Sequence, residues 1–341
     1  MRIIHVADLH LNKAITKTTR AEIPLGVYDT LARLDFAIDY TRSVGASVFI
    51  IAGDIFDTRN PLPEYRQMFY DRLMKLNGVT VILITGNHDK SPNGKEHSIH
   101  DIASLVRAGV IVADSPSFVE LDGIRYVLIP WQYSHDLPVI EAGPTTIAVC
   151  HASIEGVVGR RDRPLLLGEK EFLLTPDYFA NCDYVAMGHI HHPQTIGQIV
   201  YPGSVNVLDW GESDPHYLVD IAVTTPVVTW HHVPYPIVRP RYDLVYAATT
   251  AQDVVFPDMP PDSLCRITIN WSGQKEKLPL HKLTCMEYLL RQTDKRHHRP
   301  VDPLKDDMTE WEIFCAYLVK QGGNPSEYES LWRTISQDIG R

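Results

Sequence analysis

Several short apolar, β-branched segments of this chain end abruptly in carboxylate, amide or imidazole side chains. Such segments are typical of buried strands in a parallel sheet, whose functional side chains gather beyond the carboxyl ends of the strands. A single histidine after a strand is usually a satisfied polar residue, but five polar clusters in this position indicate a common site. The clusters are Asp8-Leu9-His10, Gly53-Asp54-Ile55-Phe56-Asp57, Gly86-Asn87-His88-Asp89, His151 and Gly188-His189-Ile190-His191.

The segments between the first strands have apolar residues at helical spacing, over residues 26–45 and 65–77. Strands that alternate with helices predict parallel pairing and an α/β core. The segment "SFVELDGIRYVLIPW" predicts a hairpin that turns at Asp122-Gly123. Later β-rich segments predict a second, mostly antiparallel sheet. We therefore expect an α/β (α+β) fold, a four-layer sandwich of two mixed β-sheets flanked by helices, over residues 1–235.

Prolines accumulate in "VPYPIVRPRYD", which indicates a domain connection. We expect a small α+β cap domain with a basic linker over residues 236–300, with strands near 241–248 and 264–271 and a helix over 280–292. Residues 301–341 predict a C-terminal helical hairpin, since the chain has a Thr309-x-x-Glu312 capping box and an Asn324-Pro325 helix start.

The composition, with 44% hydrophobic and 22% charged residues, is ordinary for a soluble globular protein. No apolar run is long enough for a membrane helix, and the first ten residues, "MRIIHVADLH", have no continuous apolar signal core. The five cysteines are scattered, which favours free thiols and a cytoplasmic location. A net charge of −10 argues mildly against a general polyanion binder. It does not exclude a metal-centred nuclease, because bound cations offset the carboxylates of such a site.

The residue types in the clusters suit hydrolysis of a phosphate ester. Two divalent ions about 4 Å apart can neutralise the phosphate oxygens and lower the pKa of a water molecule. Neutral imidazoles and carboxylate oxygens are the ligands that hold such ions. Residues two apart project to a common side, so Asp8 with His10, and His189 with His191, can reach one cavity.

This pattern resembles the calcineurin-like metallophosphoesterases, and the motifs span residues 8–191. The resemblance implies two divalent metal ions, of which Mn²⁺ is expected and Fe²⁺, Zn²⁺ or Mg²⁺ is compatible. The resemblance also implies that one ion is held by Asp8, His10 and His191 and the other by Asn87, His151 and His189. Asp54 would bridge the two ions, so it must lie within a few ångströms of ligands from both groups.

The same resemblance implies that His88 is catalytic and lies over the scissile phosphate, stabilising charge or protonating the leaving oxygen. Asp57 or Asp89 would orient it, and an ordinary role in a turn or helix cap is the alternative for both carboxylates.

The chain is most similar to the SbcD-type nuclease subunit of SbcCD double-strand-break repair complexes, in a bacterial or phage version. The segments "IIHVADLHLNK", "GDIFDTRNP", "CDYVAMGHIHHPQTIG" and "IVYPGSVNVLDWGE" carry this resemblance. It implies a DNA nuclease that works with an SbcC-type coiled-coil ATPase in repair, recombination or replication, inside a bacterial cell or a phage-infected host. Substrate contacts are expected from Arg160 and Arg161 in "GRRDRP", with a solvated loop as the alternative, and from Ser204, with a turn as the alternative.

The C-terminal helices would dock the ATPase or pack on the cap domain. A homodimer is expected from the family, with the helix that contains Met68, Phe69, Leu73 and Leu76 as a candidate surface, although core packing explains these residues equally well.

Two other functions remain open. A small-molecule phosphodiesterase, acting on a cyclic nucleotide or a nucleotide sugar, would use the same site and fits the acidic charge somewhat better. A regulatory subunit without activity is disfavoured because no ligand position is missing.

Overall fold

The computed structural model describes residues 1–13, 19–20, 22–90, 98–99, 109–132, 137–159, 172–210, 212, 215–246, 254–270 and 287–293. Their order along the chain is β1 (Arg2–Val6), β2 (Thr19–Arg20), β3 (Ile23–Pro24), α1 (Leu25–Ser43), β4 (Val48–Ala52), α2 (Pro63–Leu73), η1 (Met74–Leu76), β5 (Thr80–Ile84), β6 (Val110–Ala113), β7 (Ser117–Leu121), β8 (Ile124–Ile129), β9 (Thr146–His151), β10 (Ser153–Ile154), β11 (Leu173–Leu174), η3 (Pro176–Phe179), β12 (Tyr184–Gly188), β13 (Gln194–Ile196), β14 (Ile199–Tyr201), β15 (Tyr217–Thr224), β16 (Val227–Pro234), β17 (Arg241–Tyr246), β18 (Leu264–Asn270) and β19 (Glu287–Thr293).

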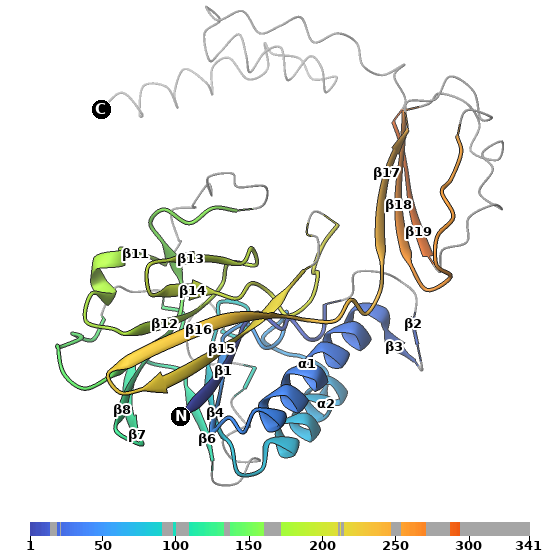
Figure 1. The fold of residues 1–341 in the computed structure, drawn as a ribbon. Coiled ribbons are helices and arrows are strands. Elements are labelled where there is room, and N and C mark those ends of the chain that lie inside the picture. Colours follow the sequence, from blue (N-terminus) through green and yellow to red (C-terminus); the bar gives the residue numbers. More distant parts are fainter. Residues whose placement is uncertain are drawn as a thin grey trace, which may run out of the picture. The chain divides into compact units, whose positions relative to one another are not determined.

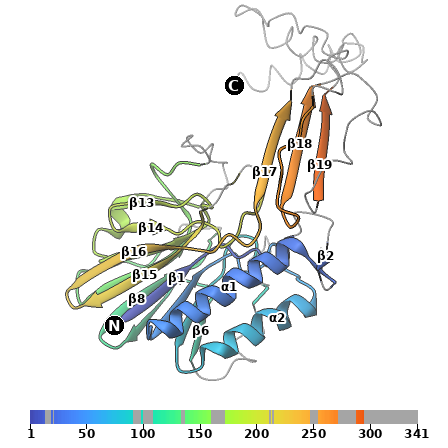
Figure 2. The ribbon, with the colours of Figure 1, turned by 45° about the vertical axis from the view of Figure 1, so that its right-hand side comes forward.

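Two six-stranded mixed sheets carry the fold, as predicted. The first has the order β16-β15-β1-β4-β5-β6, with parallel pairing from β1 to β6 and antiparallel pairing of β15 with β1 and β16. The predicted helices are present as α1 and α2, and they lie side by side on one face of this sheet (Figure 1, Figure 2).

The second sheet has the order β13-β14-β12-β9-β8-β7. Its central strands pair in parallel, and only β13 and β7 at its edges are antiparallel, so the prediction of a mostly antiparallel sheet was wrong. The antiparallel hairpin β15–β16, which suggested that prediction, extends the first sheet instead. The predicted turn between β7 and β8 is confirmed, with positive φ at Asp122 (50°) and Gly123 (76°).

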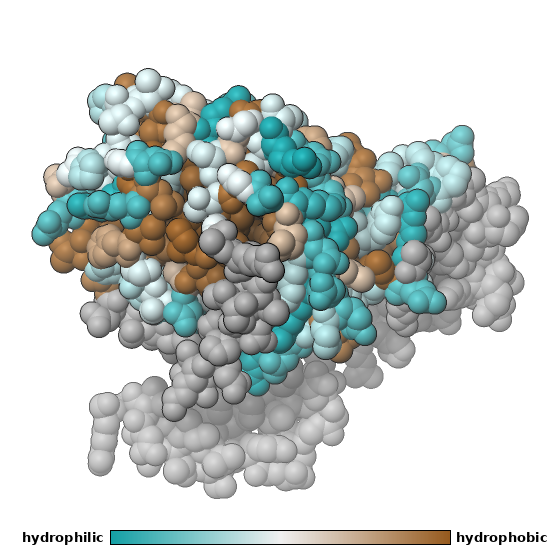
Figure 3. Space-filling view, turned by 90° about the horizontal axis from the view of Figure 1, so that it is seen from below, coloured by the Kyte–Doolittle hydropathy of each residue, from teal (hydrophilic) through white to brown (hydrophobic). Residues whose placement is uncertain are grey.

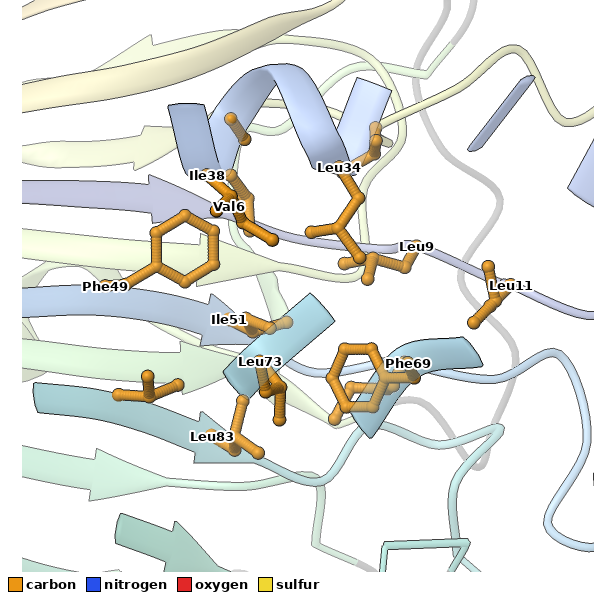
Figure 4. Packing of buried hydrophobic residues seen from close by; sticks show 14 of the residues in the cluster. Val6, Leu9, Leu11, Leu34, Ile38, Phe49, Ile51, Phe69, Leu73 and Leu83 are labelled. Carbon is orange, nitrogen blue, oxygen red and sulfur yellow. The ribbon is translucent and has the colours of Figure 1, made fainter. Parts of the chain in front are cut away.

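Alternation along the central strands divides the core between two faces. In β4, Phe49 and Ile51 pack against the helices, whereas Ile50 belongs to the cluster between the sheets. Figure 4 shows Phe49 and Ile51 beside side chains of α1 and α2, such as Leu34 and Leu73. Because every residue of β4 is buried, it reads as a continuous apolar run rather than an alternating one.

A third cluster covers the outer face of the second sheet. Cys150 and Val185 of the sheet pack there against Trp131, Phe172 and Phe179. Among the described residues this layer consists of loops and the short helix η3. The three clusters fix both sheets, and therefore the strand ends that carry the polar residues.

A smaller sheet contains β17, β18 and β19 in this order. The first two match predicted strands, but β19 occupies residues 287–293, where the sequence predicted a helix. The apolar residues of this segment are too closely grouped to distinguish the spacing of a helix from that of a strand. Pairing with β18 makes the segment a strand.

The chain divides into two compact units, of which the first contains Met1–Asp243, Asp258–Arg266 and Thr284–Leu289. The domain boundaries at residues 235 and 300 remain predictions. The basic linker after residue 293 and the predicted hairpin over residues 301–341 lie outside the described residues.

The described surface mixes both kinds of residue. Figure 3 shows a band of hydrophilic residues beside an area in which hydrophobic residues gather. The large exposed hydrophobic side chains come from separate parts of the chain, for example Leu62, Phe118 and Val227, which is ordinary for a folded protein. No helix within the described part of the chain is long and apolar enough to cross a bilayer.

Candidate metal centre

The predicted ligands lie in loops that follow the strands of both sheets. Asp8 and Asp54 follow β1 and β4, whereas His151 ends β9 and His189 follows β12. Because β4 contacts both β9 and β12, these loops face one another at one edge of the sandwich. Asp8, His10, Asp54 and His189 have φ angles of 54°, 42°, 48° and 97°. Non-glycine residues seldom occupy this left-handed region, and strain of this kind is typical of functional sites.

Asp8, His10 and His191 form a first group of donor atoms. One ligand atom from each lies within 4.8 Å of the others. Asp8 and His10 are buried, and the Nε2 atoms of His10 and His191 are 3.2 Å apart. Structure and prediction therefore agree that these side chains meet.

The partners of the Nδ1 atoms of His10 and His191 determine which ring nitrogen carries the proton. His10 Nδ1 lies 3.0 Å from Asp57 Oδ1, and His191 Nδ1 lies 3.1 Å from Glu212 Oε1. A carboxylate can only accept a hydrogen bond, so each Nδ1 is the donor. In the neutral rings both Nε2 atoms then carry lone pairs, which face each other. Facing acceptors repel unless a cation lies beside them, so the arrangement fits a metal ion.

Asn87, His151 and His189 form the second group. Asn87 Oδ1 lies 3.1 Å from His151 Nε2 and 3.0 Å from His189 Nδ1. The fully buried His151 donates from Nδ1 to the Ala52 carbonyl oxygen at 2.8 Å, which leaves its Nε2 for the site.

Asp54 lies between the two groups. Its Oδ2 atom is 3.4 Å from His10 Nε2 and 3.5 Å from His151 Nε2, as the prediction of a shared oxygen requires. Burial alone would raise the pKa of Asp54, but the neighbouring imidazoles of His151 and His10 hold it below its ordinary range. Burial alone would lower the pKa of His151, but Asp54 and Asp8 raise it to about 9. The Asp54 carboxylate therefore stays ionised although it is buried.

His88 lies beside these groups and is partly exposed, with 39% of its side chain accessible. Its backbone N–H donates to Asp54 Oδ1 at 2.9 Å, and its Nδ1 donates to the carbonyl oxygen of Asp57 at 2.9 Å. The Asp57 carboxylate is farther away, at 3.8 Å, and binds His10 Nδ1 and Lys13 Nζ, each at 3.0 Å. Asp57 therefore orients His88 through its backbone and His10 through its side chain.

Asp89, the alternative orienting residue, is fully buried. Its carboxylate accepts hydrogen bonds from the backbone of Ile55, Phe56 and Gly86 and from the Ser98 hydroxyl. These bonds hold the loops after β4 and β5 together, which is the structural role that the sequence left open.

The predicted substrate contacts differ in outcome. Ser204 is buried, its hydroxyl donates to the Asn206 carbonyl at 2.8 Å, and its N–H donates to the His191 carbonyl at 3.3 Å. Both of its donors thus serve the protein itself, as in the turn that was the alternative. Arg160 and Arg161 lie outside the described residues.

Two residues near the site had no role in the sequence analysis. Glu212 binds His191, and its only signal was its place in the Gly-Glu pair of a family motif. The Trp131 ring lies 4.9 Å from the His189 ring and 6.2 Å from the His151 ring, measured between centroids. No local signal marks Trp131, because it follows a strand like any core residue.

The glycines before the ligands are needed for close approach more than for turning. A Cβ at Gly53 would overlap the His151 ring, and a Cβ at Gly188 would overlap the Ala52 carbonyl oxygen. Of these two glycines, only Gly53 has a positive φ, of 86°. The loops of the two sheets can therefore meet only where these side chains are missing.

The donor set fits a pair of divalent cations. Buried carboxylates, an amide oxygen and imidazole nitrogens converge, and Mn²⁺, Fe²⁺ and Zn²⁺ all accept such nitrogen and oxygen ligands. The assignment of the individual ligands stays a prediction that this geometry makes specific.

The chain was compared with protein families and with solved structures. The profile of the calcineurin-like phosphoesterase family matches residues 1–193. Among solved structures, the chain is similar to a dimetal phosphatase from Danio rerio, with 12% sequence identity and a TM-score of 0.41. That match covers 69% of this chain and 96% of the Danio rerio chain.

Proposed function

The chain belongs to the calcineurin-like phosphoesterase family, whose hydrolases use two divalent cations, and we propose that it hydrolyses phosphodiester bonds of DNA. The observation that carries the hydrolytic part is the convergence of two donor groups on Asp54 Oδ2, which is 3.4 Å and 3.5 Å from imidazoles of either group. Mn²⁺ is the proposed metal.

Two bound cations would supply neutralisation of the phosphate oxygens and a water molecule of lowered pKa. The protein contributes the orientation of its imidazoles through Asp57, Glu212 and the Ala52 carbonyl. His88 is the proposed residue over the scissile phosphate. Its Nδ1–H is engaged by the Asp57 carbonyl, so Nε2 is the nitrogen that would face the substrate. From there a protonated ring donates to the leaving oxygen.

DNA is favoured by the motif segments of the SbcD-type resemblance. The segment "YPGS" contains Ser204, whose N–H donates to the His191 carbonyl, and the Gly-Glu pair contains Glu212, which binds the His191 ring. The segment "IVYPGSVNVLDWGE", one of four that carry this resemblance, therefore includes two residues that contact a predicted metal ligand.

The test is cleavage of linear double-stranded and single-stranded DNA by the purified chain with Mn²⁺. We expect cleavage, and we expect His88→Ala to lower the rate by about 100-fold or more, since general acid–base groups contribute about 10²–10⁴-fold. His231→Ala is the matched control, because His231 is 61% exposed on β16. DNA that stays intact, with and without a coiled-coil ATPase, would exclude the nuclease.

The second candidate is hydrolysis of a small phosphodiester such as a cyclic nucleotide or a nucleotide sugar. The net charge of −10 favours it, because a polyanion such as DNA is repelled by an acidic protein. Turnover of bis-p-nitrophenyl phosphate is expected for both candidates. Turnover of cyclic nucleotides without DNA cleavage would establish this candidate and exclude the first.

The proposed partners are DNA, an SbcC-type coiled-coil ATPase and a second copy of the chain, in the cytoplasm of a bacterial cell or a phage-infected host. The predicted dimer helix offers little surface, since Phe69, Leu73 and Leu76 are buried in the core. Met68 is only partly buried, and it packs against the same core. Co-purification with a coiled-coil ATPase tests the first partner, and light scattering tests the homodimer.

A further inference from the structure

The segment of residues 203–210 lies against two of the predicted metal-binding loops. The Val205 N–H donates to the Asp8 carbonyl oxygen, and the Ser204 N–H donates to the His191 carbonyl oxygen, each at 3.3 Å. A Cβ at Gly203 would lie 2.6 Å from the same His191 oxygen, so this close approach requires glycine. The segment is therefore packed against the backbone of two ligands of one cation.

Glu212 follows this segment and connects it to His191. Its Oε1 accepts a hydrogen bond from His191 Nδ1 at 3.1 Å, and its Oε2 accepts one from the Leu208 N–H at 2.6 Å. Its own N–H donates to the Asp209 carbonyl oxygen at 3.3 Å. Only 6% of its side chain is exposed. The buried carboxylate thus joins the loop that carries it to the imidazole of His191.

The segment is in turn fixed to other elements. The side-chain amide of Asn206 donates to Gly26 and Thr30 of α1, at 3.3 Å and 3.2 Å. Arg241 donates to the Val207 carbonyl oxygen at 3.0 Å, and Arg266 lies 5.7 Å from the centre of the Trp210 ring. A loop held at this many points can hold a carboxylate in one place.

The two cation positions differ in what supports their imidazoles. In the first, His10 and His191 each donate to a carboxylate, from Asp57 and Glu212. In the second, His151 donates to the neutral carbonyl oxygen of Ala52. A carboxylate behind an imidazole fixes the ring and raises its basicity as a ligand. Removing one such carboxylate should therefore affect one cation and spare the other.

We propose that Glu212 is a positioning residue that fixes His191 and thereby sets the affinity of one of the two cation positions. The proposal rests on the assignment of His191 as a metal ligand, but it does not depend on which phosphoester is cleaved.

The test is a titration of the metal-free full chain with Mn²⁺ or Co²⁺, followed by calorimetry and, for Co²⁺, by its visible absorption. The unchanged chain should bind two equivalents. In Glu212→Gln, one equivalent should bind about 10- to 100-fold more weakly, as expected when an outer carboxylate is lost. The other equivalent should keep its affinity.

Glu120→Gln is the matched control, because Glu120 lies on β7 with 70% of its side chain exposed. Glu212→Leu should weaken the same equivalent more than Glu212→Gln, whose amide oxygen can still accept from His191. A purely structural role would loosen both equivalents together. Equal weakening of both, or two unchanged equivalents, would overturn the proposal, whereas loss of DNA cleavage alone would bear only on the proposed function.

Discussion

At the scale of single residues, the site depends on side chains that are individually ordinary. A buried aspartate or a histidine after a strand has a structural explanation in most proteins. Asp89 illustrates it, since its carboxylate accepts hydrogen bonds from backbone N–H groups and the Ser98 hydroxyl. What separates the functional set is that lone pairs face one another, as at His10 and His191, where each Nδ1 is held by a carboxylate.

Asp54 is the residue whose change should have the largest effect. Asp54→Ala removes the oxygen that lies within 3.5 Å of imidazoles from both groups, so both cations should be lost. Loss of a residue that only supports a metal ligand lowers affinity or activity by up to about 100-fold. We expect Asp54→Ala to lower cation affinity and turnover by more than this. Metal analysis after dialysis and a bis-p-nitrophenyl phosphate assay measure this. Two retained cations together with unchanged turnover would refute the site, and Asp177→Asn, at an exposed position, serves as control.

His5 predicts a dependence of stability on pH. Burial lowers its pKa from 6.5 to about 3, and its ring contacts the Tyr184 hydroxyl at 3.0 Å and the Met187 carbonyl at 3.2 Å. The unfolded chain binds the proton more readily, so the stability that neutral His5 provides is complete above pH 6.5 and is lost as the pH falls toward about 3. In His5→Gln the free energy of unfolding should depend less on pH in this window. Urea titrations at several pH values measure this free energy. The same dependence of the unfolding free energy on pH in both chains would contradict the prediction.

At the scale of elements, local patterns were sufficient where an element is defined by its own residues. The helices α1 and α2, the strands before the polar clusters and the Asp122-Gly123 turn are of this kind. Strand pairing was predicted less well, because it joins distant residues. Thus β8, β9, β12 and β14 pair in parallel, and the hairpin β15–β16 joins β1 rather than its sequence neighbours.

The same distinction applies to the site. Its polar clusters could be located from sequence because each directly follows an apolar strand. Glu212 and Trp131 could not be assigned, since their roles arise from contacts with His191 and His189 that no local pattern announces. The inward hydroxyl of Ser204 is likewise a matter of three-dimensional packing.

Gly188 tests how closely β12 must approach β4. A methyl group there would overlap the Ala52 carbonyl oxygen, so Gly188→Ala should force these strands apart. We expect a loss of about 1–3 kcal/mol in the free energy of unfolding, the usual effect of overpacking, together with weaker cation binding. Gly143→Ala is the control, because its Cβ would lie 3.4 Å from the Arg125 side chain. Equal stability of both variants, from urea titrations, would disprove the close approach.

At the scale of the whole molecule, the cations should connect the two sheets. Asp8, Asp54 and Asn87 follow strands of the first sheet, whereas His151 and His189 belong to the second. Ions that bind only this folded arrangement stabilise it, by about 2.7 kcal/mol at a concentration of 100 times Kd.

Metal removal should therefore lower the melting temperature. We expect addition of a chelator to lower Tm in the unchanged chain, and we expect little change in Asp54→Ala. Differential scanning calorimetry with and without Mn²⁺ measures both. A chelator that leaves Tm of the unchanged chain where it was would indicate that the sheets hold together without ions.

The pairing of β1 with β15 has a consequence for biosynthesis. One edge of β1 pairs with β4. The other edge pairs with β15 (Tyr217–Thr224), which is synthesised more than 200 residues later. While the ribosome extends the chain, the N-terminal strand therefore offers open backbone groups, which invite wrong partners and aggregation. Co-translational chaperones should thus associate with the nascent chain until β15 has emerged.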